Sequence, residues 1–312
     1  MNEPVVVTDE LSKRYGARAA VDAVSLTVHR GEIYGFLGPN GAGKTTTLRM
    51  LVGLVRPTRG SAQVLGGRPG DPWVLRRVGA LIEGPGFYPY LSGRDNLRVF
   101  ASYNRLPGAD VERALEQVDL SARAGDKFKS YSLGMKQRLG VATALLGEPD
   151  LLILDEPTNG LDPSGMADMR ALVRRLADQG RTVLLSSHLL GEVQQICDRV
   201  GVIAAGRLLT ESTVAEFRGG SSLLVRAEPV TRAEQVIQSI LSATDVRRTE
   251  DGGLHVLTGS GRSPEIVQAL VRAGVEVHEI RPVERTLEEA FFDMTEHRQP
   301  VATHALREEA GR

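Results

Sequence analysis

The strongest constraint on this chain is a glycine-rich segment between a predicted strand and a predicted helix. Residues 38–45 read Gly-Pro-Asn-Gly-Ala-Gly-Lys-Thr and fit the phosphate-loop pattern G-x-x-x-x-G-K-[ST]. The apolar stretch 32–37 precedes the loop, and a helical stretch begins at Lys44. Glycines let the backbone wrap a phosphate with several N–H groups pointing inward. The sequence therefore predicts an ATP-binding site in an α/β fold.

The polar residues of this loop have separate chemical uses. Lys44 places a positive charge at the β- and γ-phosphates, and the Thr45 hydroxyl is available to Mg²⁺. The N-terminus of the following helix also favours anions. The predicted ATP-binding residues of the loop are Gly38, Pro39, Asn40, Gly41, Ala42, Gly43, Lys44, Thr45 and Thr46.

Two adjacent carboxylates follow a continuous apolar run further along the chain. Residues 151–154 read Leu-Leu-Ile-Leu, as expected of a buried parallel strand, and Asp155 and Glu156 follow directly. An aspartate at this position can hold Mg²⁺ through water, and the next carboxylate can polarise an attacking water. Many strands simply meet solvent in acidic residues, but the phosphate loop upstream favours the catalytic interpretation.

The bulk properties limit the partners that this chain can have. Its 312 residues suffice for two domains, and a formal net charge of −1 gives no electrostatic reason to expect nucleic acid. The single cysteine, Cys197, excludes an internal disulfide framework and fits a reducing cytosol. We find no signal-peptide pattern, and no apolar run approaches the roughly 18 residues of a membrane span. Transport across a membrane would therefore require another chain.

Strands and helices alternate through residues 1–219, which we assign to a nucleotide-binding domain. This alternation predicts an α/β domain with a largely parallel core sheet. The predicted strands are 5–7, 24–28, 32–37, 151–154 and 182–186. The predicted helices are 111–120, 166–179 and the stretch that begins at residue 44.

The character of the sequence changes after Gly219 and Gly220. The predicted elements that follow are strand 222–226, helix 233–241, strands 246–248 and 254–257, helix 264–273, strand 275–280 and a closing helix at 287–294. The order β-α-β-β-α-β is that of a ferredoxin-like unit. We therefore expect a small accessory α+β domain over 220–298 and a flexible tail over 299–312.

Several segments beyond the phosphate loop resemble motifs of the ATP-binding-cassette (ABC) superfamily. Residues 131–138 read Tyr-Ser-Leu-Gly-Met-Lys-Gln-Arg and are similar to the family's signature. Residues 159–162 resemble its D-loop and residues 186–188 its switch-histidine segment. Tyr15 stands where the family has an adenine-stacking aromatic. All of these segments occur in the family's order between residues 5 and 219.

The resemblance implies an ABC ATPase domain with a RecA-like core, an antiparallel β subdomain and a helical subdomain. It also implies a head-to-tail dimer of two such domains. In that dimer each ATP would lie between Lys44 and Thr45 of one subunit and Ser132 and Gly134 of the other.

Specific roles are implied for individual side chains. Glu156 would be the general base, His188 would contact the γ-phosphate and orient the water, and Lys44 would act at the phosphates. The ligands implied for ATP beyond the phosphate loop are Tyr15, Ser132, Gly134 and Asp162. Those for Mg²⁺ are Thr45, Glu83 and Asp155.

Two departures from the family pattern bear on the site. Leu133 and Met135 replace one Gly and the Gln of the usual Leu-Ser-Gly-Gly-Gln, whereas Ser132 and Gly134 remain. Glu83 stands where most members have the Q-loop glutamine. A carboxylate can take a place near Mg²⁺ or its water, but it cannot donate an amide hydrogen bond. The alternative for Glu83 is an ordinary solvated side chain.

Residues 83–89 resemble the bacitracin and lantibiotic self-protection branch of ABC exporters, and residues 286–291 resemble the tail of antibiotic-efflux ATPases. These resemblances imply the ATP-hydrolysing subunit of a bacterial exporter for an antibiotic, peptide or lipid-like substrate. The implied partners are an integral-membrane permease and a second copy of the chain, with no nucleic acid. The implied location is peripheral, on the cytoplasmic face of the cell membrane.

Two other functions compete with the transporter interpretation. A soluble ABC ATPase could act on ribosomes or nucleic acid. However, the translation factors of this type usually carry two cassettes, and the repair types insert a coiled coil that residues 44–132 are too few to hold. A nucleotide sensor without turnover would not need Glu156 or His188. We therefore favour the transporter.

The loop at 84–90 is rich in glycine and proline and carries Phe87, Tyr88 and Tyr90. Exposed aromatic rings on such a loop are unusual in a solitary domain and indicate an interface. We expect this loop to contact the membrane subunit. The alternative is that the rings pack against the core of the same chain.

Overall fold

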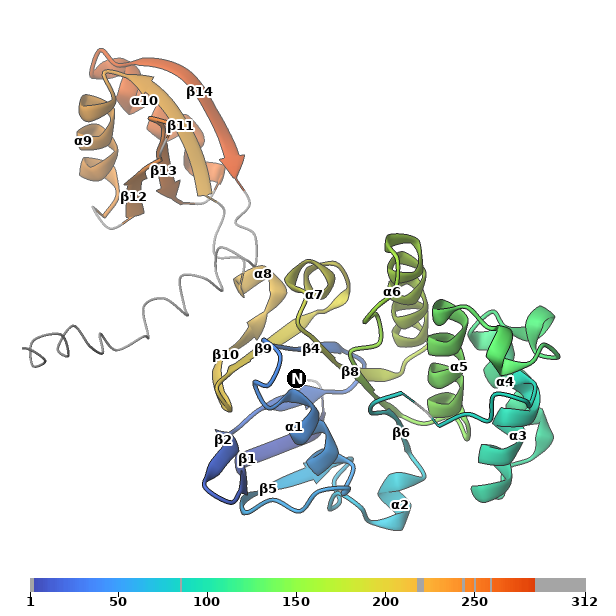
Figure 1. Cartoon of the computed structure of the whole chain (residues 1–312). Coiled ribbons are helices and arrows are strands. Elements are labelled where there is room, and N and C mark those ends of the chain that lie inside the picture. Colours follow the sequence, from blue (N-terminus) through green and yellow to red (C-terminus); the bar gives the residue numbers. More distant parts are fainter. Residues whose placement is uncertain are drawn as a thin grey trace, which may run out of the picture. The chain divides into compact units, whose positions relative to one another are not determined.

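The computed structural model describes residues 3–84, 86–217, 222–242, 245–249, 251–258 and 260–283. It divides the chain into two compact units, Met1–Val214 and Ala215–Arg312 (Figure 1). From the sequence we expect this division after residue 219. The helix expected at 287–294 and the tail expected at 299–312 lie outside the described residues.

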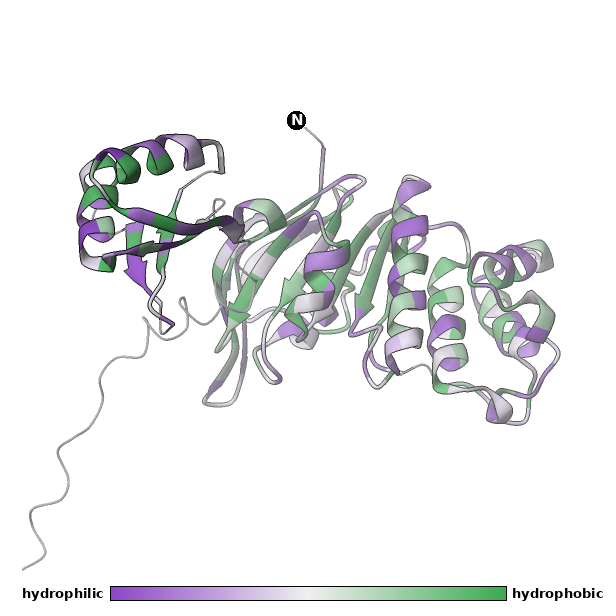
Figure 2. Ribbon diagram, turned by 90° about the horizontal axis from the view of Figure 1, so that it is seen from above, coloured by the Kyte–Doolittle hydropathy of each residue, from purple (hydrophilic) through white to green (hydrophobic). Residues whose placement is uncertain are grey.

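A six-stranded sheet in the order β10-β9-β4-β8-β7-β6 forms the centre of the first unit (Figure 1). The strands from β9 to β6 are parallel, and β10 is antiparallel to β9. All residues of β4 and β8 are buried, as is typical of parallel strands, and Figure 2 shows these central strands as strongly hydrophobic. The strands are β4 Ile33–Leu37, β6 Val78–Leu81, β7 Leu151–Asp155, β8 Thr182–Ser187, β9 Arg199–Ala204 and β10 Arg207–Thr213.

The parallel strands end at one edge of this sheet, and the loops that follow them carry the expected site residues. The phosphate loop follows β4, His188 follows β8 and Glu156 follows β7. Because β4, β8 and β7 are consecutive neighbours about 4.8 Å apart, residues distant in the sequence meet at this edge. Glu83 follows β6, one strand further from the phosphate loop.

A second sheet of the first unit is antiparallel, with the order β2-β1-β3 and with β5 also paired to β1. The single strand expected at 24–28 is wrong, because β2 ends at Val24 and β3 begins at Thr27. The Thr8 hydroxyl donates to Val24 O and accepts from Leu26 N, both at 2.9 Å, and so stabilises the break. The strands are β1 Pro4–Tyr15, β2 Arg18–Val24, β3 Thr27–His29 and β5 Arg59–Val64.

Three helices, α3, α4 and α5, pack against one another and form a helical region beside the central sheet (Figure 1). The RecA-like core, the antiparallel sheet and the helical region expected from the sequence are therefore all present. The helices of this unit's cassette are α1 Lys44–Leu51, α2 Pro72–Leu75, α3 Gly93–Tyr103, α4 Gly108–Gln117, α5 Leu133–Leu145, α6 Pro163–Asp178 and α7 Leu190–Ile196, and the short helix α8 Val214–Phe217 follows β10.

The aromatic loop before α3 divides into buried and exposed rings. Phe87 is 9% exposed, and its ring centroid lies 5.7 Å from that of Phe100 and 4.9 Å from that of Phe128. Phe87 therefore belongs to the core of the helical region, and its expected exposure is wrong. Tyr88 and Tyr90 are 41% and 65% exposed and agree with the expectation.

The second unit contains a four-stranded antiparallel sheet in the order β12-β13-β11-β14. β13 lies between β11 and β12, and β11 lies between β13 and β14, so two β-α-β units interleave as in a ferredoxin-like fold. The elements are β11 Ser222–Glu228, α9 Val230–Ile240, β12 Val246–Arg248, β13 Leu254–Leu257, α10 Ser263–Arg272 and β14 Glu276–Val283. Within the described parts of both units, no helix combines the length and apolar character needed to span a membrane.

Candidate nucleotide-binding and catalytic site

At two positions of the phosphate loop, the surrounding structure leaves room only for glycine. Gly43 is the N-cap of α1 with a φ of 110°, and a Cβ there would lie 2.5 Å from the carbonyl oxygen of Ala20. A Cβ on Gly38 would lie 2.2 Å from the carbonyl oxygen of Ile203. The glycines of the motif thus let the loop pass close to β2 and β9 while it leads into the first turn of α1.

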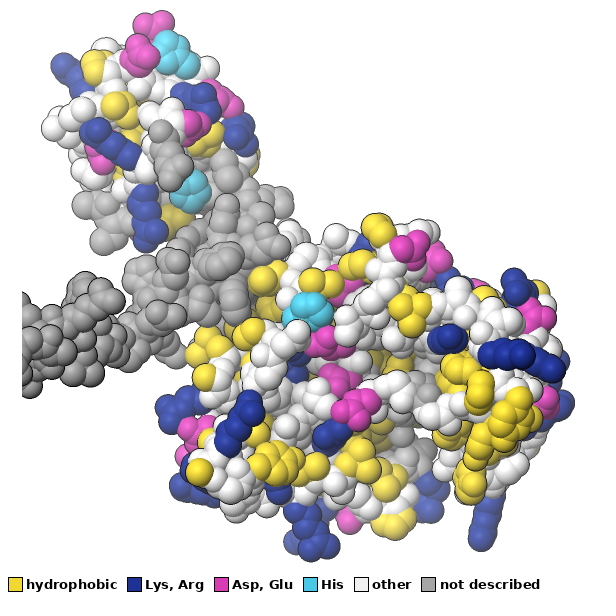
Figure 3. All heavy atoms as spheres, viewed as in Figure 1, with side chains coloured by type: hydrophobic (Ala, Val, Ile, Leu, Met, Phe, Trp, Pro, Cys, Tyr) yellow, Lys and Arg dark blue, Asp and Glu magenta, His cyan; other side chains and the backbone are white. Residues whose placement is uncertain are grey.

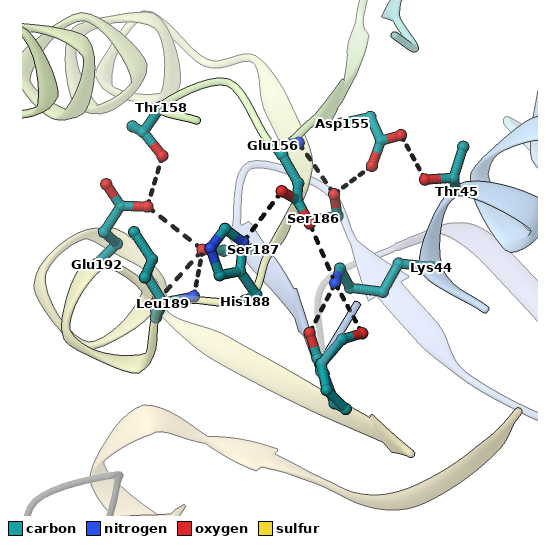
Figure 4. Close-up of polar contacts among 12 residues, drawn as sticks. Lys44, Thr45, Asp155, Glu156, Thr158, Ser186, Ser187, His188, Leu189 and Glu192 are labelled. Atoms are coloured by element: carbon teal, nitrogen blue, oxygen red, sulfur yellow. Dashed lines mark hydrogen bonds and ion pairs between the residues drawn. The ribbon is translucent and has the colours of Figure 1, made fainter. Parts of the chain in front are cut away.

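The Lys44 side chain lies inside this loop and is 5% exposed. Its Nζ donates hydrogen bonds to the carbonyl oxygens of Gly38 at 2.6 Å and Pro39 at 3.2 Å. The same Nζ lies 3.1 Å from Glu156 Oε1. The ammonium group is therefore held between the loop that is expected to bind phosphate and the carboxylate that is expected to act as the base (Figure 4).

A pocket of about 340 Å³ opens beside the loop. Its lining combines a half-exposed tyrosine ring, backbone N–H groups of a glycine loop and two cationic side chains. These groups suit the adenine ring of a nucleotide at one end and its phosphates at the other. Lys13 Nζ lies 5.2 Å from the centroid of the Tyr15 ring and supports it. The lining residues are Tyr15, Arg18, Ala20, Asn40, Gly41, Gly43, Lys44, Thr45, Thr46 and Glu156.

Arg18 and Ala20 are pocket residues that the sequence analysis did not identify. They lie on β2, which begins directly after the short turn that follows Tyr15 at the end of β1. Their closeness to Tyr15 in the sequence is the one signal that could have indicated them.

Both carboxylate oxygens of Asp155 accept hydrogen bonds. Thr45 Oγ1 donates to Asp155 Oδ2 at 2.7 Å, and Ser186 Oγ donates to Asp155 Oδ1. A hydroxyl and a carboxylate side by side are oxygen ligands of the kind that Mg²⁺ uses together with phosphate and water. Among the described residues no group of three or more His, Cys, Asp or Glu side chains could hold a metal ion. The pair therefore fits an ion that takes its other ligands from the nucleotide and water.

Glu156 and His188 are brought together by neighbouring strands. His188 Nδ1 lies 3.0 Å from Glu156 Oε2, and the Glu156 backbone N–H donates to Ser186 Oγ at 3.0 Å (Figure 4). Glu156 has a φ of 47°, in the left-handed region that non-glycine residues rarely adopt. Strained conformations of this kind cluster at functional sites because the surrounding structure imposes them.

Glu83 lies apart from the Thr45–Asp155 pair. Its carboxylate forms an ion pair with Arg49 on α1, and its side chain is 65% exposed. Glu83 does not line the pocket. Glu83 follows β6, which is separated from β4 by two strands, whereas Asp155 ends β7, which is separated from β4 by one.

The remaining expected ligands begin helices of the same subunit and do not line its pocket. Ser132 is the N-cap of α5 and accepts a hydrogen bond from Met135 N. Gly134 follows in the first turn of α5. Asp162 is the N-cap of α6, where Oδ1 accepts from Gly165 N at 3.1 Å.

The space-filling view of the first unit shows an uneven distribution of charge. Acidic side chains gather near the centre of the face in view, and lysine and arginine side chains lie mostly towards its edge (Figure 3). Hydrophobic side chains gather over the helical region (Figure 3). Tyr90, Tyr103 and Leu133 in that region are 65%, 79% and 47% exposed.

A phosphate loop after β4, a carboxylate pair at the end of β7 and a histidine after β8 define a P-loop ATPase. The ABC transporter family profile matches residues 21–159. The bacitracin transport ATP-binding protein BcrA of Bacillus licheniformis is 39% identical over 296 residues, which are 93% of this chain and 97% of that protein. The chain therefore belongs to the ABC transporter family, whose ATP-binding subunits hydrolyse ATP to power transport.

Two further similarities support this assignment. The lantibiotic transport ATP-binding protein SrtF of Streptococcus pyogenes is 39% identical over 213 residues, which are 68% of this chain and 91% of that protein. A solved structure of the ATP-binding subunit of an ABC transporter is 32% identical with a TM-score of 0.61. The similarity covers 69% of this chain and 92% of that one.

Proposed function

We propose that this chain is the ATP-hydrolysing subunit of a bacterial exporter that moves an antibiotic, peptide or lipid-like substrate. The observation that carries the proposal is the contact series from Lys44 through Glu156 to His188, set at the ends of neighbouring strands. Similarity to proteins named for bacitracin and lantibiotic transport, over most of this chain, supports the substrate class.

In this proposal ATP lies with its base near Tyr15 and its phosphates in the loop before Lys44. Mg²⁺ would be held by Thr45 and, through water, by Asp155, where it would neutralise charge on the phosphates. Glu156 would accept a proton from the attacking water, and its 3.0 Å contact with His188 would keep the carboxylate oriented. Because Glu83 is paired with Arg49, it would contact a water bound to Mg²⁺ rather than Mg²⁺ itself.

A second copy of the chain would complete the site. Ser132 and Gly134 are exposed or half-buried at the start of α5 and are not used by the pocket of their own subunit. The N-terminus of α5 would offer backbone N–H groups and a hydroxyl to the γ-phosphate bound by the other copy. The two cassettes would then close on two ATP molecules, with Asp162 near the shared boundary.

The membrane partner would be a separate integral-membrane permease, with this chain bound to its cytoplasmic face. The exposed rings of Tyr88 and Tyr90 would form part of the contact, since aromatic side chains are enriched at interfaces. Residues 1–219 would act as the motor and residues 220–298 as an accessory domain.

The proposal is tested in a host sensitive to bacitracin and lantibiotics. The chain is expressed with the permease that it captures from detergent-solubilised membranes, and the wild type is compared with Glu156→Gln. We expect the wild type, but not Glu156→Gln, to protect the cells from these antibiotics. Capture of a permease without protection would refute the antibiotic class, and failure to associate with any membrane protein would refute the transport function.

A further inference from the structure

Glu192 is a buried carboxylate that none of the roles above uses. It lies in the first turn of α7 and is 5% exposed. Its Oε2 accepts a hydrogen bond from Thr158 Oγ1 at 2.6 Å and lies 3.3 Å from Ser187 Oγ (Figure 4). Thr158 and Ser187 are themselves 6% and 3% exposed, so the three polar groups meet away from solvent.

The two hydroxyl groups come from the two loops that carry the reacting side chains. Thr158 is two residues beyond Glu156 in the loop between β7 and α6, and Ser187 directly precedes His188 at the end of β8. Ser187 Oγ also accepts from Leu189 N at 2.9 Å, which fixes the turn around His188. Glu192 therefore holds the segment after Glu156 against the segment that carries His188.

The Glu192 carboxylate has few hydrogen-bond and charge partners for a group that is so deeply buried. Its Oε1 has no hydrogen-bond partner among the described residues, and the nearest cation is Arg170, whose Nη1 lies 3.9 Å away. A hole of about 10 Å³ beside Thr158, Arg170 and Glu192 is close to the smallest that can hold one water. Burial of an incompletely paired carboxylate lowers stability, and an apolar side chain of similar size is often tolerated better. Stability therefore does not account for a glutamate at this position.

We propose that Glu192 is a positioning residue for ATP hydrolysis, which holds Glu156 and His188 at the separation that turnover needs. The inference rests on the roles proposed above for Glu156 and His188. Glu192 does not line the candidate nucleotide pocket, and in this proposal it acts through Thr158 and Ser187. Loss of its contacts lets the two loops separate while the phosphate loop, on α1 and β4, keeps its geometry.

Two pairs of variants separate positioning from general stability. Glu192→Leu and Thr158→Val remove the hydrogen bond and keep the approximate shape, whereas Glu192→Gln and Thr158→Ser keep an acceptor or a hydroxyl. We expect Glu192→Leu and Thr158→Val to lower kcat by about 10-fold or more, because small errors in the placement of reacting groups are costly. The KM for ATP should change by less than about 2-fold, since the phosphate loop is intact. Glu192→Gln and Thr158→Ser should restore most of the rate.

The matched controls are Glu32→Gln and Thr182→Val. Both residues are buried and hydrogen-bonded, but they lie at the opposite end of the core sheet from the site. We expect both control variants to keep the wild-type kcat at a temperature where the protein is folded, whatever their effect on the thermal midpoint. Glu192→Leu should lower kcat even where its thermal midpoint equals or exceeds that of the wild type. The double variant Glu192→Leu/Thr158→Val should be no slower than the slower single variant, because both remove one contact.

These measurements are made on the full chain with Mg²⁺-ATP, beside Glu156→Gln. Wild-type kcat in Glu192→Leu together with inactive Glu156→Gln would overturn the positioning role and leave the proposed function intact. Equal losses in Glu192→Leu and in the two controls would also overturn it. Full turnover in Glu156→Gln would instead refute the proposed base. If Glu192→Leu does not fold, the comparison of Thr158→Val with Thr158→Ser decides the question.

Discussion

Lys44 Nζ and Glu156 Oε1 lie 3.1 Å apart, so the phosphate-loop lysine and the proposed base form an ion pair within the site. Their side chains are 5% and 20% exposed, which limits screening by water. A nucleotide phosphate that binds Lys44 competes with Glu156 for the same ammonium group. When Lys44 turns towards the phosphate, the remaining partner of the Glu156 carboxylate among the described side chains is His188. We therefore expect the binding of ATP to release the proposed base Glu156 from Lys44.

Lys44→Ala should abolish tight nucleotide binding. Hydrogen bonds to charged groups contribute about 1.5–3 kcal/mol each, so we expect affinity to fall by at least 10-fold. Equilibrium titration with a fluorescent ATP analogue measures this. The control is Lys129→Ala, whose side chain is exposed and outside the pocket. Equal affinities in the Lys44 variant and the wild type would contradict the phosphate-loop assignment.

Glu156→Gln should separate binding from turnover. The amide cannot accept a proton from water, so we expect kcat to fall about 10²–10⁴-fold. Nucleotide affinity should be kept or increased, because a negative charge beside the phosphates is removed. Steady-state hydrolysis and an ATP titration on the same preparation provide both numbers. Glu148→Gln is the control, since this glutamate is exposed and pairs with Arg113.

The aromatic loop should respond differently at each ring. Phe87→Ala removes a ring packed between Phe100 and Phe128 and should cost about 3–5 kcal/mol of unfolding free energy. The double variant Tyr88→Ala/Tyr90→Ala should keep stability and ATP affinity but weaken capture of the permease from solubilised membranes. Denaturant titration and a pull-down test the two expectations. Unchanged capture by the tyrosine variant would show that the permease binds elsewhere.

The sequence shows which residues end the buried strands, and the strand order in the structure brings those residues together. The phosphate loop and Glu156 are recognisable from their motifs after apolar runs, and His188 from its resemblance to a family segment, whereas the neighbouring of β4, β8 and β7 comes from the structure. The β-α-β-β-α-β order of the second unit is likewise visible from element type alone. The position of Glu83 outside the pocket depends on the same tertiary pairing, which the sequence does not show.

The features that sequence patterns miss depend on single tertiary contacts. Thr8 breaks the strand expected at 24–28 through its hydroxyl, and Phe87 is buried because Phe100 and Phe128 leave a place for it. Glu192 follows the switch-histidine segment by a few residues, but nothing in the pattern shows that it reaches Thr158. The local sequence does not show which distant residues these side chains will contact.

Truncation after Gly219 should leave nucleotide binding unchanged. Every residue that lines the pocket lies between Tyr15 and Glu156, and the compact first unit ends at Val214. We therefore expect a folded fragment whose ATP affinity is within about 3-fold of the full chain, a difference below 1 kcal/mol. Circular dichroism and ATP titration test this. A folded fragment that fails to bind ATP would place part of the site in the second unit.

Arg199 on β9 links the central sheet to β3 of the antiparallel sheet through its hydrogen bond to Thr27, and it also pairs with two carboxylates. Its guanidinium lies 3.3 Å from Glu32 Oε1 and 3.2 Å from Glu211 Oε1, and it donates to Thr27 O at 2.9 Å. Burial raises the pKa of Glu32, and its hydrogen bond from His29 N and the charge of Arg199 oppose that rise. Removal of Arg199 leaves two largely buried carboxylates without their common cation.

We expect Arg199→Met to lower the free energy of unfolding by about 3 kcal/mol at pH 7. The loss should shrink as pH falls towards 4. Glu32 has a raised pKa in the folded state, so its protonated form favours folding and this contribution disappears as pH rises through that pKa. A protonated Glu32 needs no cation, and the variant should approach the wild type at low pH. Denaturant titrations at several pH values measure the difference.

Arg207→Ala, whose pair with Asp22 is exposed, should cost less than about 1 kcal/mol at every pH. A loss in Arg199→Met that is independent of pH would show that packing against Tyr34, rather than charge, explains the role of Arg199.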